Sequence, residues 1–135
     1  MEEGRGGSMK TSKAGQLRVL VVDDEALLLY HLSDLLEELG HIPVCASSGV
    51  QALSLLTSEP AVDLIITDQS MPEMNGTELA MTVREYDPEL PVVLASGYGE
   101  SIRDTGVELP CLAKPFTIAE LEKMIAAVAF SSDNR

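Results

Sequence analysis

The feature that most constrains the fold of this chain is a regular alternation of short apolar runs with segments of helical spacing. Five runs rich in β-branched residues predict strands, at Leu17–Val22, Ile42–Ala46, Val62–Thr67, Pro91–Ala95 and Leu109–Ala113. Several of them are apolar at consecutive positions, which is typical of parallel strands that helices cover on both faces. The alternation therefore predicts an open α/β fold with right-handed crossover connections.

Helical spacing fills most of the intervals between and after these runs. The predicted helices cover Glu25–Leu39, Val50–Ser58, Thr77–Tyr86 and Ile118–Phe130. The first ends before Gly40, a residue type common just past a helix end, and Thr117 with Glu120 forms a capping-box sequence at the start of the last. Between the fourth and fifth runs only Glu100–Asp104 is available, among glycines, so we expect a short or irregular element there.

Length and charge narrow the class of protein. The 135 residues leave room for one domain, and 9 Lys+Arg against 22 Asp+Glu give a formal net charge of -13. Such an acidic chain lacks the basic patch that nucleic-acid binding requires, and no apolar stretch is long enough to span a membrane. Cys45 and Cys111 form no close-spaced metal or redox motif. We expect a compact cytoplasmic domain with no direct nucleic-acid contact and no membrane insertion.

The two ends of the chain are predicted to be tails. Residues 1–16 contain no Val, Ile, Leu or aromatic residue and cannot bury apolar area, so we expect a disordered segment. Met9 follows Gly-Gly-Ser, which is consistent with a fused leader ahead of a native start. The predicted domain covers residues 17–130, and 131–135 form a short tail. If the chain is the whole protein, its output runs through a protein surface.

Polar or charged residues follow four of the five predicted strands. Asp23 and Asp24 end the first, Asp68 the third, Ser96 the fourth and Lys114 the fifth. In an open parallel sheet the ligand site lies beyond the carboxyl ends of the strands, at the switch in strand order. Taken singly, each residue has a structural explanation as a helix cap, a turn residue or a solvated lysine. Their coincidence at one edge indicates a site.

The chemistry of this cluster points to phosphoryl transfer. Three carboxylates crowded together are costly without a cation, and an open, all-oxygen site suits Mg²⁺. A metal beside a carboxylate nucleophile and a lysine can stabilise a transferring phosphoryl group. We therefore expect Asp68 to attack phosphorus and form an aspartyl phosphate. Mg²⁺ and Lys114 would neutralise the phosphoryl oxygens, and the Ser96 hydroxyl would donate to one of them.

The motifs around these residues resemble those of receiver domains of the two-component response regulator family. The resemblance covers about Leu17 to Phe130 and includes single-domain receivers and those of hybrid histidine kinases. Its motifs are Val-Val-Asp23-Asp24-Glu25, Asp68-Gln-Ser-Met-Pro-Glu-Met-Asn-Gly76, Ala-Ser96-Gly and Lys114-Pro-Phe116. The resemblance implies a flavodoxin-like (βα)₅ fold, with a five-stranded parallel sheet of order 2-1-3-4-5.

Roles for individual residues follow from the resemblance. It implies that Asp68 is the phosphoacceptor, that Asp23 and Asp24 bind Mg²⁺ with Asp68, and that the backbone carbonyl of Ser70 is a further metal ligand. Lys114 contacts the phosphate, with a cis bond to Pro115. The phosphodonor would be a histidine kinase or a histidine phosphotransfer protein, and the output a downstream protein target. The chain would act as a signalling domain rather than as an enzyme in its own right.

The sequence also departs from the family pattern. Cys111 stands three residues before Lys114, where many receivers carry a Tyr or Phe that rotates with the Ser96 position. The implied strand order sends Cys45 and Cys111 to opposite edges of the sheet, too far apart for a disulfide. The short interval before Lys114 implies a truncated or unwound fourth helix, so a dimer through that region is not assumed.

Surplus apolar residues on the first helix suggest a partner surface. Leu28, Leu32 and Leu35 suffice for a core stripe, and Leu27, Leu29 and Tyr30 widen it. Such a face could dock a four-helix phosphotransfer bundle, or it could be a broad buried face.

Two alternative functions stay open. A pseudo-receiver would act as an interaction scaffold, although the retained acidic residues and Lys114 argue against it. A Mg²⁺-dependent aspartyl-phosphate phosphatase would place its nucleophile after the first strand in an Asp-x-Asp pattern, whereas that strand ends Asp-Asp-Glu25 here. A third function, that of a flavin- or nucleotide-binding module, is disfavoured because it would need a glycine-rich phosphate loop in place of Asp23 and Asp24.

Overall fold

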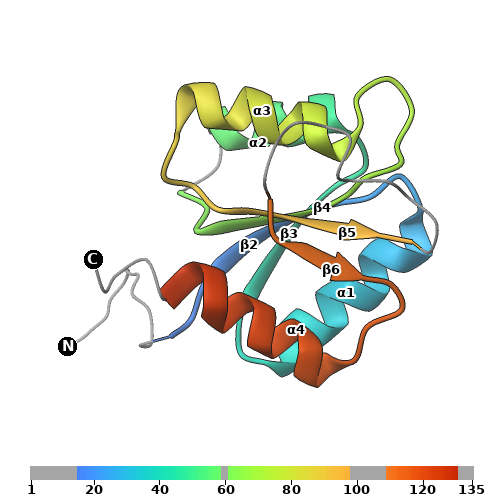
Figure 1. Cartoon of the computed structure of the whole chain (residues 1–135), viewed down its shortest axis with the longest axis vertical. Coiled ribbons are helices and arrows are strands. Elements are labelled where there is room, and N and C mark those ends of the chain that lie inside the picture. The colour runs from blue at the N-terminus through green and yellow to red at the C-terminus, as the bar shows by residue number, and fades with distance from the viewer. Residues whose placement is uncertain (1–14, 59–60, 98–108, 131–135) are drawn as a thin grey trace.

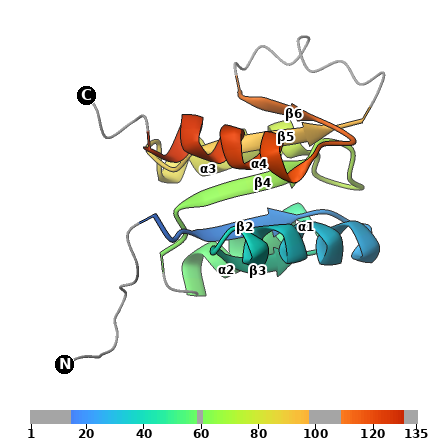
Figure 2. The same cartoon turned by 90° about the horizontal axis from the view of Figure 1, so that it is seen from below.

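A parallel sheet forms the centre of the molecule (Figure 1). The computed structural model describes residues 15–58, 61–97 and 109–130. Within them, five strands lie in the order β3-β2-β4-β5-β6, and each neighbouring pair is parallel. Their bounds are β2 Arg18–Val22, β3 Ile42–Ala46, β4 Leu64–Asp68, β5 Val92–Ser96 and β6 Cys111–Ala113. Counted along the chain this is the order 2-1-3-4-5, so the predicted topology is confirmed. Figure 2 displays the strands from β3 at one edge to β6 at the other.

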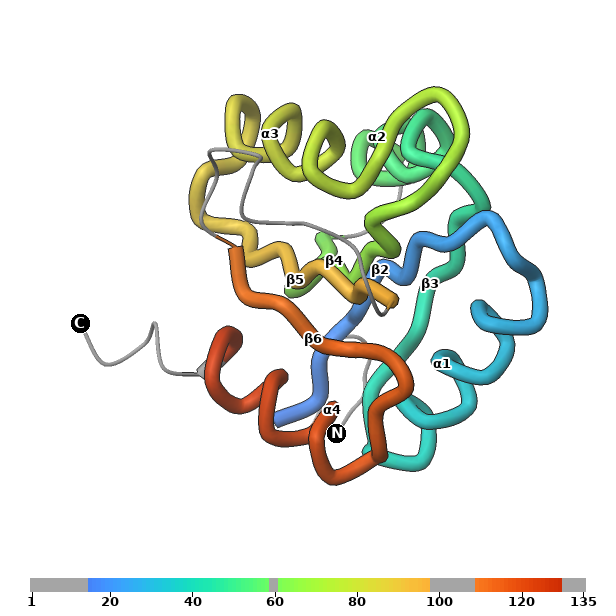
Figure 3. The backbone as a smooth tube through the Cα atoms, turned by 45° about the vertical axis from the view of Figure 1, so that its right-hand side comes forward, coloured from blue at the N-terminus to red at the C-terminus, as the bar shows by residue number. Residues whose placement is uncertain are grey.

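Helices cover both faces of the sheet. They are α1 Ala26–Glu38, α2 Gly49–Ser58, α3 Gly76–Tyr86 and α4 Ile118–Ile125, the last continuing as a π-helical stretch over Ala126–Phe130. Figure 1 shows α2 and α3 on one face and α1 and α4 on the other. The tube in Figure 3 follows β2 into α1 and β6 into α4 on the same side of the sheet.

The two faces have separate cores, and β2 contributes to both. Val19 and Val21 belong to the core beneath α1 and α4, whereas Leu20 and Val22 belong to the core beneath α2 and α3. All four are at most 1% exposed. Successive residues of a strand point to opposite faces, so a strand buried on both faces must be apolar at every position. The consecutive apolar pattern of the sequence is thereby explained.

Two of the predicted helix ends have the expected geometry. Thr117 Oγ1 accepts a hydrogen bond from the Glu120 N–H at 3.1 Å, and Glu120 Oε1 accepts one from the Thr117 N–H at 2.9 Å, which completes the capping box of α4. Gly40 follows the end of α1 with a φ of +92°, a left-handed conformation that glycine adopts at no steric cost.

The apolar surplus of α1 differs in part from the prediction. Leu27 and Tyr30 are 82% and 73% exposed, as a partner surface requires. Leu29, however, packs against the core, and Leu28, which the spacing assigns to the core stripe, is 37% exposed. The core-facing side of α1 is therefore shifted around the helix relative to the prediction, because nearly every position in this stretch is apolar and spacing alone does not select a face.

Several predictions concern other parts of the chain. The short element at Glu100–Asp104 lies outside the described residues, as do most of the N-terminal tail and all of residues 131–135. Cys45 on β3 and Cys111 on β6 are free, exposed thiols, and their expected placement at opposite edges of the sheet is confirmed. In the part of the chain that the structure describes, no helix has the length and apolarity to cross a membrane.

Candidate functional site

The polar residues at the strand ends gather around the switch in strand order. Asp23 and Asp24 follow β2, and Asp68 is the last residue of β4, the neighbour of β2 in the sheet. Ser96 ends β5 and Lys114 follows β6. Because the chain passes from β2 to β3 on one side and later returns to β4 on the other, the connections diverge there and leave room for a ligand. The fold thus brings these five residues to one edge.

Three carboxylates form the centre of the site. Oxygen atoms of Asp23, Asp24 and Asp68 all lie within 4.8 Å of one another. Asp23 and Asp68 are each 7% exposed, whereas Asp24 is exposed. The cluster is therefore anchored in the protein on one side and open to solvent on the other. An all-oxygen, partly exposed donor set of this kind is what hard divalent cations bind.

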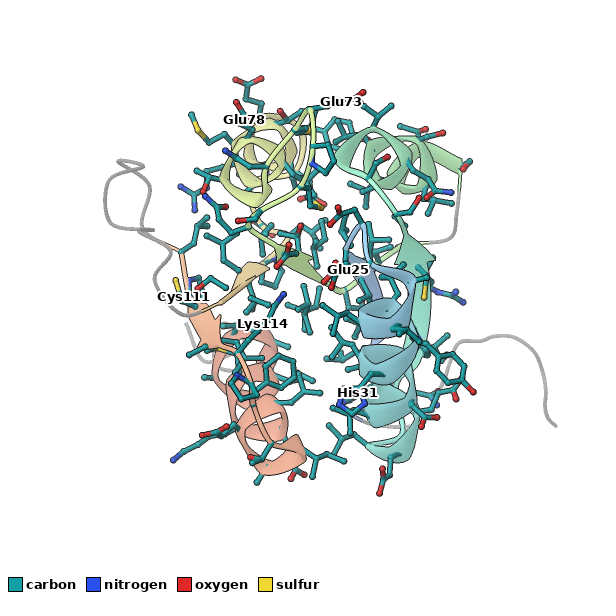
Figure 4. All side chains as sticks on the ribbon, turned by 90° about the vertical axis from the view of Figure 1, so that its right-hand side faces the viewer. Glu25, His31, Glu73, Glu78, Cys111 and Lys114 are labelled. Carbon is teal, nitrogen blue, oxygen red and sulfur yellow. The ribbon has the colours of Figure 1, made fainter. Side chains whose placement is uncertain are left out.

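Lys114 is a cation that contacts this cluster. Its Nζ atom lies 2.5 Å from Oδ1 of Asp68 and 3.6 Å from Oδ2 of Asp23. Figure 4 shows its amino group pointing from β6 toward the middle of the sheet edge. Lys114 offsets at most one of three negative charges, so the site retains a capacity for a further cation.

The main chain around Lys114 is tied to the neighbouring strand. The Lys114 N–H donates to the Ser96 carbonyl at 2.9 Å. This bond to the end of β5 fixes the main-chain position of Lys114. The peptide bond from Lys114 to Pro115 is cis, as the resemblance predicts.

Several influences act on the pKa of Asp23, and burial is the largest. Burial raises the pKa of Asp23, and the neighbouring Asp24 and Glu25 carboxylates add to this. A hydrogen bond from the Glu25 N–H to Oδ1 of Asp23, at 2.9 Å, and the nearby Lys114 ammonium lower the pKa without cancelling the rise. The charged form of Asp23 is thus less favoured in the folded protein than in water, and a bound cation would favour it.

Ser96 and Ser70 lie near Asp68, one on the neighbouring strand and one along the chain. Ser96 is 8% exposed and follows Ala95, which is the register partner of Asp68. Ser70 is exposed and lies two residues beyond Asp68, in the connection to α3. Both residues therefore border the phosphoacceptor candidate, one through the sheet and one along the chain.

Cys111 does not resemble the aromatic residue whose position it takes. It is exposed on the edge strand β6, and its Sγ donates to the carbonyl of Leu109 at 3.3 Å. Burial of part of the side chain raises the pKa of the Cys111 thiol.

The connection after Asp68 contains residues whose contacts the sequence does not reveal. A Cβ atom at Gly76 would collide with the Asp68 carbonyl oxygen and would lie 2.7 Å from Cδ2 of Leu94. The side chain of Gln69 accepts hydrogen bonds from both the N–H and the hydroxyl of Thr77, each at 2.9 Å. Gly76 could have been recognised from its place in the motif, but no spacing in the sequence pairs a glutamine with a threonine eight residues away.

A known protein family matches the sequence of this chain. The family described as "Response regulator receiver domain" matches residues 19–126, which is most of the chain and includes each of the site residues above.

Individual relatives agree with this match. A probable transcriptional regulator, ycf27, of Guillardia theta is 36% identical over 115 residues, which make up 82% of this chain and 44% of that protein. The sensor histidine kinase RcsC of Salmonella typhi is 35% identical over 118 residues, 84% of this chain and 12% of the kinase. The two-component response regulator ORR5 of Oryza sativa subsp. japonica is 35% identical over 128 residues, 90% of this chain and 95% of that protein. The chain thus spans less than half of the first two relatives and nearly all of the third.

Solved structures give the same result for the fold. A response regulator receiver domain protein from Clostridium thermocellum superimposes with a TM-score of 0.80 at 27% sequence identity, over 87% of this chain and 98% of that one. The likeness in fold therefore extends over most of this chain and nearly all of that one.

Proposed function

This chain belongs to the response regulator receiver domain family, and from that premise we propose that Asp68 accepts a phosphoryl group from a phosphohistidine donor. The observation that carries the proposal is the position of Lys114 Nζ, 2.5 Å from the Asp68 carboxylate and at the margin of the Asp23–Asp24–Asp68 cluster. A buried nucleophile, a fixed ammonium group and a cation-binding set then share one edge of the sheet.

We propose Mg²⁺ as the cation of this site. Asp23, Asp24 and Asp68 would hold it through carboxylate oxygens, with the Ser70 carbonyl as a fourth protein ligand. When bound, the ion supplies positive charge against the phosphoryl oxygens. The fit rests on the donor chemistry: the cluster offers only oxygen atoms, is open on the Asp24 side, and has an excess of negative charge.

The positions of the side chains support the following transfer. A carboxylate oxygen of Asp68 forms a bond to phosphorus while the bond between phosphorus and the donor's imidazole nitrogen breaks, and that nitrogen keeps the bonding electron pair. Lys114 then moves from the Asp68 carboxylate to a phosphoryl oxygen, which carries the charge that the carboxylate loses. The Ser96 hydroxyl donates to another phosphoryl oxygen. The same groups would assist hydrolysis of the product, so the domain would promote its own phosphorylation and dephosphorylation.

The donor is proposed to dock on α1. This helix begins three residues after Asp23, and the Leu27 and Tyr30 side chains near its start are largely exposed. Apolar side chains in that position suit the apolar groove of a helical bundle that carries a phosphorylated histidine. Kinship with a sensor histidine kinase and a two-component response regulator supports such a donor. The output would pass by protein contact to a downstream target.

The proposed relay belongs in the cytoplasm. Cys45 and Cys111 are both exposed and free, which suits a reducing compartment.

Phosphorylation is tested by intact-mass measurement. The protein is incubated with a small phosphodonor and Mg²⁺, and we expect a single phosphate-sized increase that is absent in Asp68→Asn. Asp63→Asn is the matched control, because Asp63 is an exposed aspartate before the start of β4 and should leave the increase intact. An unchanged mass, or labelling that survives Asp68→Asn, would refute the proposal. If Mg²⁺ also produces no change in the unphosphorylated protein, the scaffold alternative is favoured.

A further inference from the structure

The start of α3 is held by a residue of the candidate site. Gly76 and Thr77 are the first two residues of this helix, and their N–H groups have no partner within it. The Gly76 N–H donates to the backbone carbonyl of Gln69 at 3.0 Å, and the Thr77 N–H donates to Oε1 of the same glutamine at 2.9 Å. Gln69, which directly follows the phosphoacceptor candidate Asp68, thus caps α3 from a distance.

Asn75 is the local cap of the same helix. Its Oδ1 accepts from the Glu78 N–H at 2.8 Å, and its own N–H donates to Oε1 of Glu78 at 2.9 Å, which forms a capping box. The four N–H groups at the helix start are therefore shared equally between a local cap and a remote one. A single local cap is the common arrangement, so the second one needs its own explanation.

Gln69 is fixed by its main chain as well as its side chain. Its N–H donates to the Ala95 carbonyl of β5 at 3.2 Å, and its Oε1 accepts a second bond from the Thr77 hydroxyl at 2.9 Å. Thr77 is only 5% exposed and Gln69 is half-buried, so these bonds are partly buried. A residue tied to a strand through its N–H and to a helix through its carbonyl and side chain has little freedom to rotate.

The peptide groups on either side of Gln69 belong to Asp68 and Ser70. On the Asp68 side, the Thr67 hydroxyl donates to the Asp68 carbonyl at 3.0 Å, and the missing Cβ of Gly76 leaves room for that carbonyl. On the other side begins the exposed connection that carries Ser70. Gln69 therefore separates a rigid strand end from an exposed loop.

We propose that Gln69 and Thr77 form a positioning pair, which fixes the main chain between Asp68 and Ser70 and so preorganises the cation site. This inference rests on the proposed function, in which Asp68 and Ser70 are ligands of Mg²⁺. Mg²⁺ demands nearly ideal octahedral geometry, so a ligand on a mobile loop must be ordered at the moment of binding. A loop that is already ordered loses less conformational entropy on binding, and affinity rises accordingly.

The main test replaces the acceptor of both side-chain bonds. Gln69→Leu keeps a similar size but cannot accept from Thr77, and we expect its affinity for Mg²⁺, measured by titration calorimetry, to fall about tenfold, a typical loss on removing a supporting residue. The Thr77 amide should also exchange with solvent deuterium faster. Asn75→Ala is the matched control, because it weakens the cap of the same helix and leaves Gln69 untouched. It should lower stability without changing the affinity for Mg²⁺.

A second pair of variants isolates the hydroxyl. Thr77→Val keeps the shape of the side chain and removes one of the two bonds to Gln69, so we expect a smaller loss of affinity than in Gln69→Leu. Thr77→Ser keeps the donor and should restore the affinity of the parent protein. This pair is decisive if Gln69→Leu does not fold.

The outcomes separate this inference from the proposed function. If the parent protein binds Mg²⁺ and Gln69→Leu binds it equally well, the positioning role is wrong and the proposed function stands. The same conclusion holds if Asn75→Ala loses as much affinity as Gln69→Leu, since the effect would then come from helix capping alone. If the parent protein itself binds no Mg²⁺, the proposed function fails first.

Discussion

The sheet has an amino-terminal edge, where its strands begin, and a carboxyl-terminal edge, where they end. These two edges use polar side chains in opposite ways. At the amino-terminal edge, Oδ2 of Asp63 accepts from the Arg18 N–H at 2.8 Å, and Nδ1 of His41 accepts from the Leu17 N–H at 3.1 Å. Each of these side chains completes a backbone bond where a strand begins. At the carboxyl-terminal edge, Asp23, Asp24, Asp68 and Lys114 lie against one another, although Asp23 also accepts from the Glu25 N–H.

This difference separates two roles of a polar residue at a strand end, which are to stabilise the fold and to bind a ligand. Polar groups that satisfy the backbone stabilise the fold and have little left to offer a ligand. Carboxylates that face each other weaken the fold, because like charges repel in a partly buried place, and this is the arrangement that a cation or a phosphoryl group can exploit. The amino edge should therefore govern stability, and the side chains of the carboxyl edge should govern binding.

The largest expected effect tests whether the carboxyl edge is rigid in its backbone. Gly76→Ala places a Cβ against the Asp68 carbonyl, which cannot move without shifting β4, so we expect a loss of about 1–3 kcal/mol in the free energy of unfolding. Gly49→Ala is the control, because its Cβ meets the flexible Met74 side chain, with Sδ at 2.6 Å. Urea unfolding of both variants measures the difference. Equal losses would mean that the backbone here yields as readily as a side chain.

Neutralising one carboxylate separates binding from stability. Asp23→Asn should weaken Mg²⁺ binding about tenfold or more, because a charged ligand is lost. It should also raise the free energy of unfolding at neutral pH in the absence of Mg²⁺. The pKa of Asp23 is raised in the folded protein, so the stability that it contributes at low pH is lost as the pH rises through that pKa. Asparagine keeps an acceptor for the Glu25 N–H without the charge. A variant less stable than the parent would contradict the comparison of the edges.

The corresponding change at the amino edge should have the reverse outcome. Asp63→Ala removes the acceptor for the Arg18 N–H, and we expect the free energy of unfolding to fall by about 1 kcal/mol. Phosphorylation and Mg²⁺ binding should be unchanged, because the residue precedes β4 and Asp68 ends it. Chemical denaturation and calorimetric titration on the same preparation measure both. A loss of Mg²⁺ affinity would show that the two edges are not independent.

The smallest effect concerns the pH dependence of the amino edge. Burial lowers the pKa of His41 below its usual 6.5, while Glu122 opposes the shift. The unfolded chain then takes up this proton more readily, so stability falls as the pH drops through 6.5 toward the folded pKa. His41→Asn retains an acceptor for the Leu17 N–H, and its unfolding midpoint should fall less over this range than that of the parent. Identical pH profiles of the two proteins would exclude His41 as the titrating group.

Much of the fold was predictable because the apolar pattern is strong. All five strands and their order follow from the runs and from the family resemblance. The boundaries were less accurate: Asp68 pairs with Ala95 as part of β4, but an apolar pattern ends before a charged residue. The run from Leu109 was too long, because pairing with β5 begins at Cys111. Charge and hydropathy do not record how far a neighbouring strand extends.

The candidate site was predictable to a similar extent. Asp23, Asp24, Asp68 and Lys114 could be placed together because parallel strands share a carboxyl edge. The bonds between Gln69 and Thr77 could not, because they depend on how the chain returns from β4 into α3, and both residue types are common in ordinary loops. The exposed side of α1 was equally hidden, since leucines stand on both sides of its core stripe.

The two thiols allow the width of the sheet to be measured. Cys45 and Cys111 occupy its outermost strands, are exposed and are free, so a pair of dyes or spin labels attached there would span the full width of the sheet without any added cysteine. The raised pKa of Cys111 slows its reaction with thiol reagents near neutral pH, which leaves time to control the order of labelling. The two native cysteines thereby allow a measurement of whether phosphorylation changes the distance between β3 and β6.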